Sequence, residues 1–202
     1  MFRQIAPSRQ TAQTRVAQTY TRPQIAGDLN VVIVGWRDTN AQVTSVTDSK
    51  GNIYQLAIGP TKQTSRLSQS IYYANNIVAA SSRTNSISVG FTAAARFVDL
   101  RILEYSGINA TSPLDLAIGA SGSSVTSDSG LMTTRNANDL LVAGNVVITS
   151  TASAGPNFTS RLLTRTDADI AEDRVVTSIG AYNALAPLTG SGPWVMQGQH
   201  SR

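Results

Sequence analysis

The sequence contains no cysteine and a single histidine, His200. Without cysteine, neither a disulfide framework nor a thiolate metal site can form. Hydrolysis by a Ser-His-Asp arrangement needs a histidine that accepts the proton of the nucleophile. The only candidate lies among the last five residues, where we expect a solvated side chain. No Gly-rich or Walker-type phosphate loop is present, so we expect a protein that is not an enzyme.

Charged residues are scarce, and long hydrophobic runs are missing. Charged side chains make up 14% of the chain and hydrophobic ones 41%, against about 25% charged in an average soluble domain. No apolar run approaches the roughly 18 residues that a membrane span requires, so we expect no membrane span. The first 24 residues also lack the apolar stretch of a secretory signal peptide.

Acidic residues are absent from residues 1–24, which contain Arg3, Arg9, Arg15 and Arg22. The chain has 16 basic and 12 acidic residues, so these four arginines account for the whole net charge of +4. We therefore expect two parts, a basic N-terminal arm at residues 1–24 and a β-sandwich domain at residues 25–202.

The arm arginines are widely spaced among Gln, Thr and Ala. Nucleic-acid tails usually carry dense blocks of positive charge, so nucleic acid is the least favoured partner. In an extended strand, Arg3, Arg9 and Arg15 would share one face, which suits docking on a neighbouring protein through forked hydrogen bonds. A solvated leader is the alternative.

Short runs rich in Val, Ile, Thr and Tyr recur between Gly, Ser, Asn and Asp clusters. This rhythm predicts an all-β fold, a single antiparallel β-sandwich or jelly roll with an extended N-terminal arm and little helix. Residues 30–36 are nearly all apolar and predict a central strand covered on both faces. The Gly-rich and Ser-rich stretch at residues 119–130 predicts a loop or a weak edge segment.

Two local patterns make sharper predictions. Residues 42–47 and 53–58 flank the turn sequence DSKGN, which predicts a β-hairpin. In residues 98–105, Val98, Leu100 and Ile102 alternate with Asp99, Arg101 and Tyr105. Period-two geometry then places the first set in the core and the second on the surface.

Several motifs together carry a family resemblance. The segments VTSVTDSKGNIYQLAIGP, LSQSIYYANNIVA, DLRILEYSGINATSPLD, NANDLLVAGN, AEDRVVTSIGAY and GPWVMQ occur in this order between residues 27 and 197. In them the chain resembles a group of largely uncharacterised bacterial β-sandwich modules of large secreted or surface proteins. The resemblance implies a non-catalytic extracellular-type module and transfers no catalytic residues. Residues 1–24 and the tail at residues 198–202 lie outside it.

Two sets of side chains remain as candidate binding sites. One acid cluster in TDADIAEDR could offer calcium its oxygen ligands, although a solvated or salt-bridged loop with Arg165 and Arg174 is favoured; its members are Asp167, Asp169, Glu172 and Asp173. Exposed aromatic rings with planar polar groups bind sugars, although core packing is the favoured role of each aromatic residue; the candidates are Tyr72, Tyr73, Tyr105 and Trp194.

These observations favour a structural or attachment protein, foremost a virion surface component such as a capsid decoration, fibre or spike held by its arm. Its expected partners are neighbouring subunits in a homo-oligomer or larger assembly. The alternative is a carbohydrate-binding or adhesion module of a secreted bacterial surface protein, with surface glycans as ligands. The expected location is accordingly a virion, or the extracellular or cell surface.

Overall fold

The fold consists of antiparallel β-strands. The computed structural model describes residues 3–5, 8–9 and 11–202, and within this part the chain contains no helix. The strands are β1 (Arg3–Ile5), β2 (Ser8–Arg9), β3 (Gln13–Thr19), β4 (Leu29–Trp36), β5 (Val43–Asp48), β6 (Gln55–Gln63), β7 (Leu67–Ala74), β8 (Ser86–Ala95), β9 (Val98–Tyr105), β10 (Leu114–Thr133), β11 (Asp139–Val147), β12 (Thr159–Leu163), β13 (Ile170–Val176) and β14 (Ala181–Ser201).

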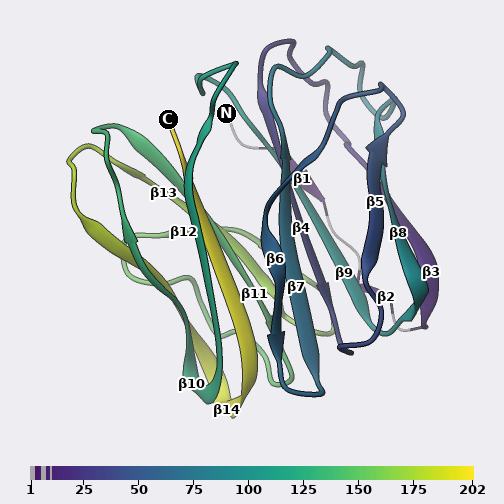
Figure 1. The fold of residues 1–202 in the computed structure, drawn as a ribbon, viewed down its shortest axis with the longest axis vertical. Helices are drawn as coiled ribbons and strands as arrows, with labels where there is room; N and C mark the ends of the chain where they lie inside the picture. The colour runs from purple at the N-terminus through teal and green to yellow at the C-terminus, as the bar shows by residue number, and fades with distance from the viewer. Residues whose placement is uncertain (1–2, 6–7, 10) are drawn as a thin grey trace.

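Three sheets form successive layers (Figure 1). The middle, six-stranded sheet has the order β1-β9-β4-β7-β6, and β2 also pairs with β9. A five-stranded sheet, β10-β14-β11-β13-β12, lies on one side of it, and a three-stranded sheet, β3-β8-β5, lies on the other. The prediction of an all-β, sandwich-like fold is confirmed.

The middle sheet is buried on both faces. One face packs Val32, Val34 and Leu100 against the three-stranded sheet, and the other packs Ile33 and Leu103 against the five-stranded sheet. Every residue of β4 and of β9 is buried. The predicted central strand at residues 30–36 is thus confirmed.

The prediction of a solvent-facing side for residues 98–105 is wrong. Asp99 and Arg101 are fully buried, and Tyr105 is 6% exposed. The alternation in β9 is real, but both faces of the strand are covered because a second sheet packs on the polar one. Hydrogen bonds and ion pairs must then compensate the buried polar groups.

The predicted hairpin is wrong in its pairing, although its turn forms. The Asp48 carboxylate accepts the backbone N–H groups of Lys50 and Asn52, both at 3.0 Å. The flanking strands do not pair with each other, since β5 pairs with β8 and β6 pairs with β7. The turn therefore carries the chain from the three-stranded sheet to the middle sheet.

The longest strands, β10 and β14, form one antiparallel ribbon. The stretch at residues 119–130 lies inside β10, which is the edge strand of its sheet. The ladder shifts register between Ser124 and Thr126. Beyond this shift, Met132, Ala184 and Ala186 pack in one cluster with the β11 side chains Leu141 and Ala143. The far half of the ribbon therefore covers the outer face of its own sheet.

The N-terminal segment belongs to two sheets. β1 and β2 pair with β9 in the middle sheet, whereas β3 pairs with β8 in the three-stranded sheet. Val16 and Tyr20 are buried, at 3% and 2% exposure, in the core between these sheets. The boundary expected at residue 24 therefore falls within a continuous packing unit.

Candidate functional site

Arg3, Arg9 and Arg15 do not lie on one continuous strand in the structure. Arg3 lies opposite Glu104 and Arg9 opposite Val98 in the middle sheet. Arg15 is in the three-stranded sheet, where its Nε donates to Ser88 Oγ at 2.6 Å. Arg22 is exposed and follows β3. Intramolecular strand pairing thus places Arg3 and Arg9 in the middle sheet and Arg15 in the three-stranded sheet, and the docking role of these arginines stays a prediction.

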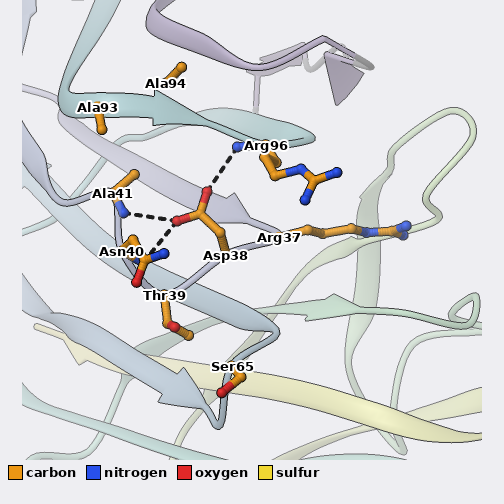
Figure 2. A pocket seen from close by; sticks show the side chains of 9 residues that line it. All are labelled: Arg37, Asp38, Thr39, Asn40, Ala41, Ser65, Ala93, Ala94 and Arg96. Atoms are coloured by element: carbon orange, nitrogen blue, oxygen red, sulfur yellow. Dashed lines mark hydrogen bonds between the residues drawn. The ribbon is translucent and has the colours of Figure 1, made fainter.

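A cleft of about 440 Å³ lies where the loop after β4 meets the turn between β8 and β9 (Figure 2). Asp38 organises it, because its carboxylate accepts the backbone N–H groups of Asn40 at 3.0 Å, Ala41 at 2.8 Å and Arg96 at 3.0 Å. Figure 2 shows Arg37 and Arg96 extending to the same side of this cleft. The Asp38 carboxylate is therefore engaged with the backbone of the cleft wall.

Arg37 itself links the sheets. Its Nη2 lies 3.3 Å from Asp167 Oδ1 and donates to the Val147 carbonyl at 3.0 Å. Its guanidinium also lies 5.5 Å from the centre of the Phe97 ring, an arrangement that adds a cation–π contribution. These contacts indicate that Arg37 mainly stabilises the fold.

A buried charge cluster lies between the middle and five-stranded sheets. Arg101 Nη1 donates to the carbonyls of Asn145 at 2.6 Å and Ile170 at 2.5 Å, and Nη2 donates to Gln69 Oε1 at 3.0 Å. Burial raises the pKa of Asp169 well above its usual range, and the nearby Asp99 raises it further. Burial also raises the pKa of Asp99, while Asp169 and Arg101 oppose the rise.

Paired carboxyls with raised pKa values are a feature of some acid–base sites. Here, however, Arg101, Asp99 and Asp169 have no exposed surface. A substrate cannot reach them without separating the two sheets. We therefore interpret the cluster as an intersheet structural element.

The four acids considered for calcium are all buried. They point to separate partners: Asp167 to Arg37, Asp169 to the cluster with Asp99, Glu172 to the Gly155 N–H at 2.9 Å, and Asp173 to Arg161 Nε at 2.8 Å. Arg37 and Arg161 form ion pairs with two of these acids, and Arg101 lies beside Asp169. Arg174, which was expected to pair with these acids, has its guanidinium 5.1 Å from the ring centre of Tyr182.

The aromatic candidates contribute mainly to packing. Tyr73, Tyr105 and Trp194 are 9%, 6% and 8% exposed. Trp194 Nε1 donates to Ser124 Oγ at 2.9 Å. Tyr72 is partly buried and packs against the core between the middle and three-stranded sheets. None of these four offers a fully exposed ring face of the kind that stacks on a sugar.

Sequence reasoning missed a groove of about 510 Å³ at one end of the molecule. Its polar lining is neutral and comes from amides and one hydroxyl, Asn52, Gln55, Asn75, Asn76 and Thr111. Asn52 Oδ1 accepts the Val78 N–H at 2.8 Å, and Asn75 Nδ2 donates to the Ala110 carbonyl at 2.5 Å. These bonds hold together loops that are distant in sequence. We call this feature the amide groove.

Exposed aliphatic side chains border the amide groove. Ile53 is 80% exposed and Val78 is 55% exposed, and both line it. Ile25 is 51% exposed and lies in the segment that runs beside residues 77–80, to which Gln24 and Gly27 donate backbone hydrogen bonds. No charged side chain is present among the described residues that line the groove. No residue type in the sequence signals this surface, because its parts come from three separate loops.

The environment of His200 also differs from the one expected from the sequence. The structure gives its side chain no exposure and puts it on β14, beside Asp115 and Asp139. The expectation of a solvated terminal histidine is wrong, because β14 continues to Ser201 between β10 and β11. Its single occurrence near the chain end gave no sign of burial.

Comparison with known proteins identifies no family for this chain. No family model, no curated protein and no solved structure matches this chain. In the described residues, no helix has the length and apolar character needed to cross a membrane.

Proposed function

We propose that this chain is a non-enzymatic structural or attachment module that docks on a neighbouring protein subunit through the aliphatic rim of the amide groove, formed by Ile53 and Val78. A virion surface component, such as a capsid decoration, fibre or spike, is the assembly that this proposal favours. The observation that carries it is the exposure of Ile53 and Val78 in the lining of one neutral groove.

Exposed aliphatic groups favour a protein partner over a sugar. Fully burying an Ile or Val side chain contributes about 1.5–3 kcal/mol, and interface cores are depleted in charge. A sugar site would instead use an accessible aromatic face, whereas the aromatic candidates contribute to packing. The proposed point of attachment is thus the amide groove, and not the N-terminal arm expected from the sequence.

Two variants test the docking surface. Ile53→Ser and Val78→Ser each remove an exposed aliphatic group. Ile179→Ser is the matched control, because Ile179 is 65% exposed but lies in the loop between β13 and β14. We expect the full chain to self-associate with increasing concentration in sedimentation velocity. The two groove variants should weaken association by about tenfold each, and the control should not.

Self-association that is equal in all four proteins would contradict docking through this rim. A chain that stays monomeric at every concentration would remove the homo-oligomer from the proposal. In that case, capture of a capsid or fibre subunit from its own particle, with the same four proteins, becomes the deciding measurement.

The amide groove also favours a second candidate function, a carbohydrate-binding or adhesion module. Its amide side chains offer donors and acceptors that suit sugar hydroxyls. A glycan array with the wild type and Gln55→Ala tests this alternative. Binding lost in Gln55→Ala but retained in Ile53→Ser would support the sugar module over the docking module.

A further inference from the structure

Three side chains from three adjacent strands meet at one end of the five-stranded sheet. Asp115 lies at a register shift of β10, Asp139 begins β11, and His200 is on β14 between them. The two carboxylates and the imidazole place ligand atoms within 4.8 Å of one another. Strand pairing thus assembles a compact set of one nitrogen and two oxygen donors.

The donors of two members are buried without hydrogen-bond partners. His200 and Asp139 have no exposed surface, and neither ring nitrogen of His200 and neither carboxylate oxygen of Asp139 has such a partner. His200 Nδ1 lies 3.2 Å from Asp139 Oδ2 and 3.5 Å from Asp115 Oδ2. Apart from this ion pairing within the cluster, His200 Nε2 and Asp139 Oδ1 have no hydrogen-bond partner, although buried polar groups are nearly always paired.

The charges of this cluster favour a cation. Two carboxylates face one imidazole, so a charge of −1 remains even when His200 is protonated. Besides His200, the charged side chain of Arg202 acts on Asp139. Arg202 is exposed, and its Nε donates to the Ser112 carbonyl.

Two of the donor distances can be compared with those of known metal sites. In a tetrahedral zinc site with bonds of about 2.0–2.1 Å, neighbouring donor atoms lie roughly 3.3–3.4 Å apart. An octahedral site with bonds of about 2.0–2.1 Å brings neighbouring donors to roughly 2.8–3.0 Å. The distances from His200 Nδ1 to Asp139 Oδ2 and Asp115 Oδ2, 3.2 and 3.5 Å, are compatible with the tetrahedral case. Calcium has longer bonds that give a similar spacing, but it takes oxygen ligands, so the imidazole nitrogen favours zinc.

We propose that Asp115, Asp139 and His200 bind one Zn²⁺ ion in a tetrahedral site whose fourth ligand is water. Asn136 acts as the outer partner, because its Nδ2 donates to Asp115 Oδ2 at 3.2 Å and orients that carboxylate. The ion reaches the site past Asp115, whose side chain is 12% exposed. Bound zinc fastens the end of β14 to both neighbouring strands. This proposal is independent of the docking function.

The composition makes the test specific. The chain has no cysteine and one histidine, so a zinc site with an imidazole or thiolate ligand must use His200. Its imidazole proton signals in an NMR spectrum belong to this one residue. The full-length chain is first freed of metal with a chelator and then titrated with Zn²⁺, or with Co²⁺ as a coloured probe.

We expect saturable binding of one Zn²⁺ per chain, a shift of the His200 imidazole signals, and the visible absorption of tetrahedral Co²⁺. Asp115→Asn and His200→Gln should each weaken binding by about tenfold or more. Asp128→Asn is the matched control, since Asp128 is on the same strand opposite Leu185 and should leave binding unchanged.

Two results would overturn the proposal. One is the absence of saturable Zn²⁺ binding by the wild type. The other is binding that Asp115→Asn leaves unchanged while the His200 signals do not move. Because Asp115 is only partly buried, its variant remains informative even when His200→Gln does not fold. Zinc should also raise the unfolding temperature of the wild type and of Asp128→Asn, but not that of Asp115→Asn.

Discussion

The Arg101 guanidinium lies between two sheets and donates to the Asn145 carbonyl at 2.6 Å. Arg101 belongs to β9 of the middle sheet, and Asn145 belongs to β11 of the five-stranded sheet. With Asp99 and Asp169 beside it, this arginine makes the intersheet contact polar at its centre.

Replacement of Arg101 by Met should therefore be strongly destabilising. Removal of one partner from a buried ionic group costs about 3–5 kcal/mol, because the remaining charge and acceptors stay buried. Urea unfolding at neutral pH measures this loss. Adding Asp99→Asn to the Met variant should restore part of the stability, whereas a loss below about 1 kcal/mol for Arg101→Met would contradict the structural role.

Glu172 should make stability depend on pH. Burial raises its pKa from 4.5 to about 7 in the folded protein, and the Gly155 N–H opposes the rise. The folded state therefore binds the proton more tightly than the unfolded state, so this group lowers stability as pH rises from 4.5 to about 7. The full effect is at most roughly 3 kcal/mol.

Glu172→Gln should remove this dependence. Relative to the wild type, the variant should have an increasing free energy of unfolding across that pH interval, and it should remain the more stable protein at higher pH. Urea unfolding over the interval tests the prediction, with Asp128→Asn as the control for a general charge effect. Parallel stability curves for Glu172→Gln and the wild type would disprove the raised pKa.

Deletion of residues 1–22 should destabilise the domain. The deletion removes β3 and with it Val16 and Tyr20 from the core beside the middle sheet. Loss of one large buried side chain costs about 2–5 kcal/mol, so thermal unfolding should shift markedly downward. Deletion of residues 1–10 alone keeps β3 and should shift it less. Equal unfolding temperatures for the longer deletion and the full chain would contradict the role of β3.

Gly155 should not tolerate a side chain. A Cβ atom at this position would overlap the Leu185 carbonyl oxygen, and overpacking of this kind typically costs about 1–3 kcal/mol. At Gly190, a Cβ atom would meet nothing within 4 Å. Chemical denaturation should thus show a clear loss for Gly155→Ala and little change for Gly190→Ala.

Local sequence patterns predicted the strands better than their partners. The apolar run at residues 30–36 correctly indicated a strand covered on both faces. Its one amide side chain, Asn30, is also buried, and it donates a hydrogen bond to the Tyr54 hydroxyl. The turn at Asp48 was also visible in the sequence. Which strands it joins was not, because turn chemistry sets local backbone geometry and not the sheet that each strand enters.

The candidate sites were predicted less well for the same reason. The acid cluster of residues 167–173 was conspicuous in the sequence, yet its carboxylates have separate partners. The groove beside Ile53 and the cluster around His200 each combine segments that are far apart in the chain. No pattern within one segment indicates such combinations.

The sequence by itself determined the all-β class, the absence of cysteine chemistry and the low charge, because these depend on composition and on period-two alternation. Only the tertiary structure decided that the polar face of β9 is buried, that β3 joins the core, and that His200 meets two carboxylates. Each of these follows from the packing of three layers on one another, and the exposure of a side chain depends on what covers its strand.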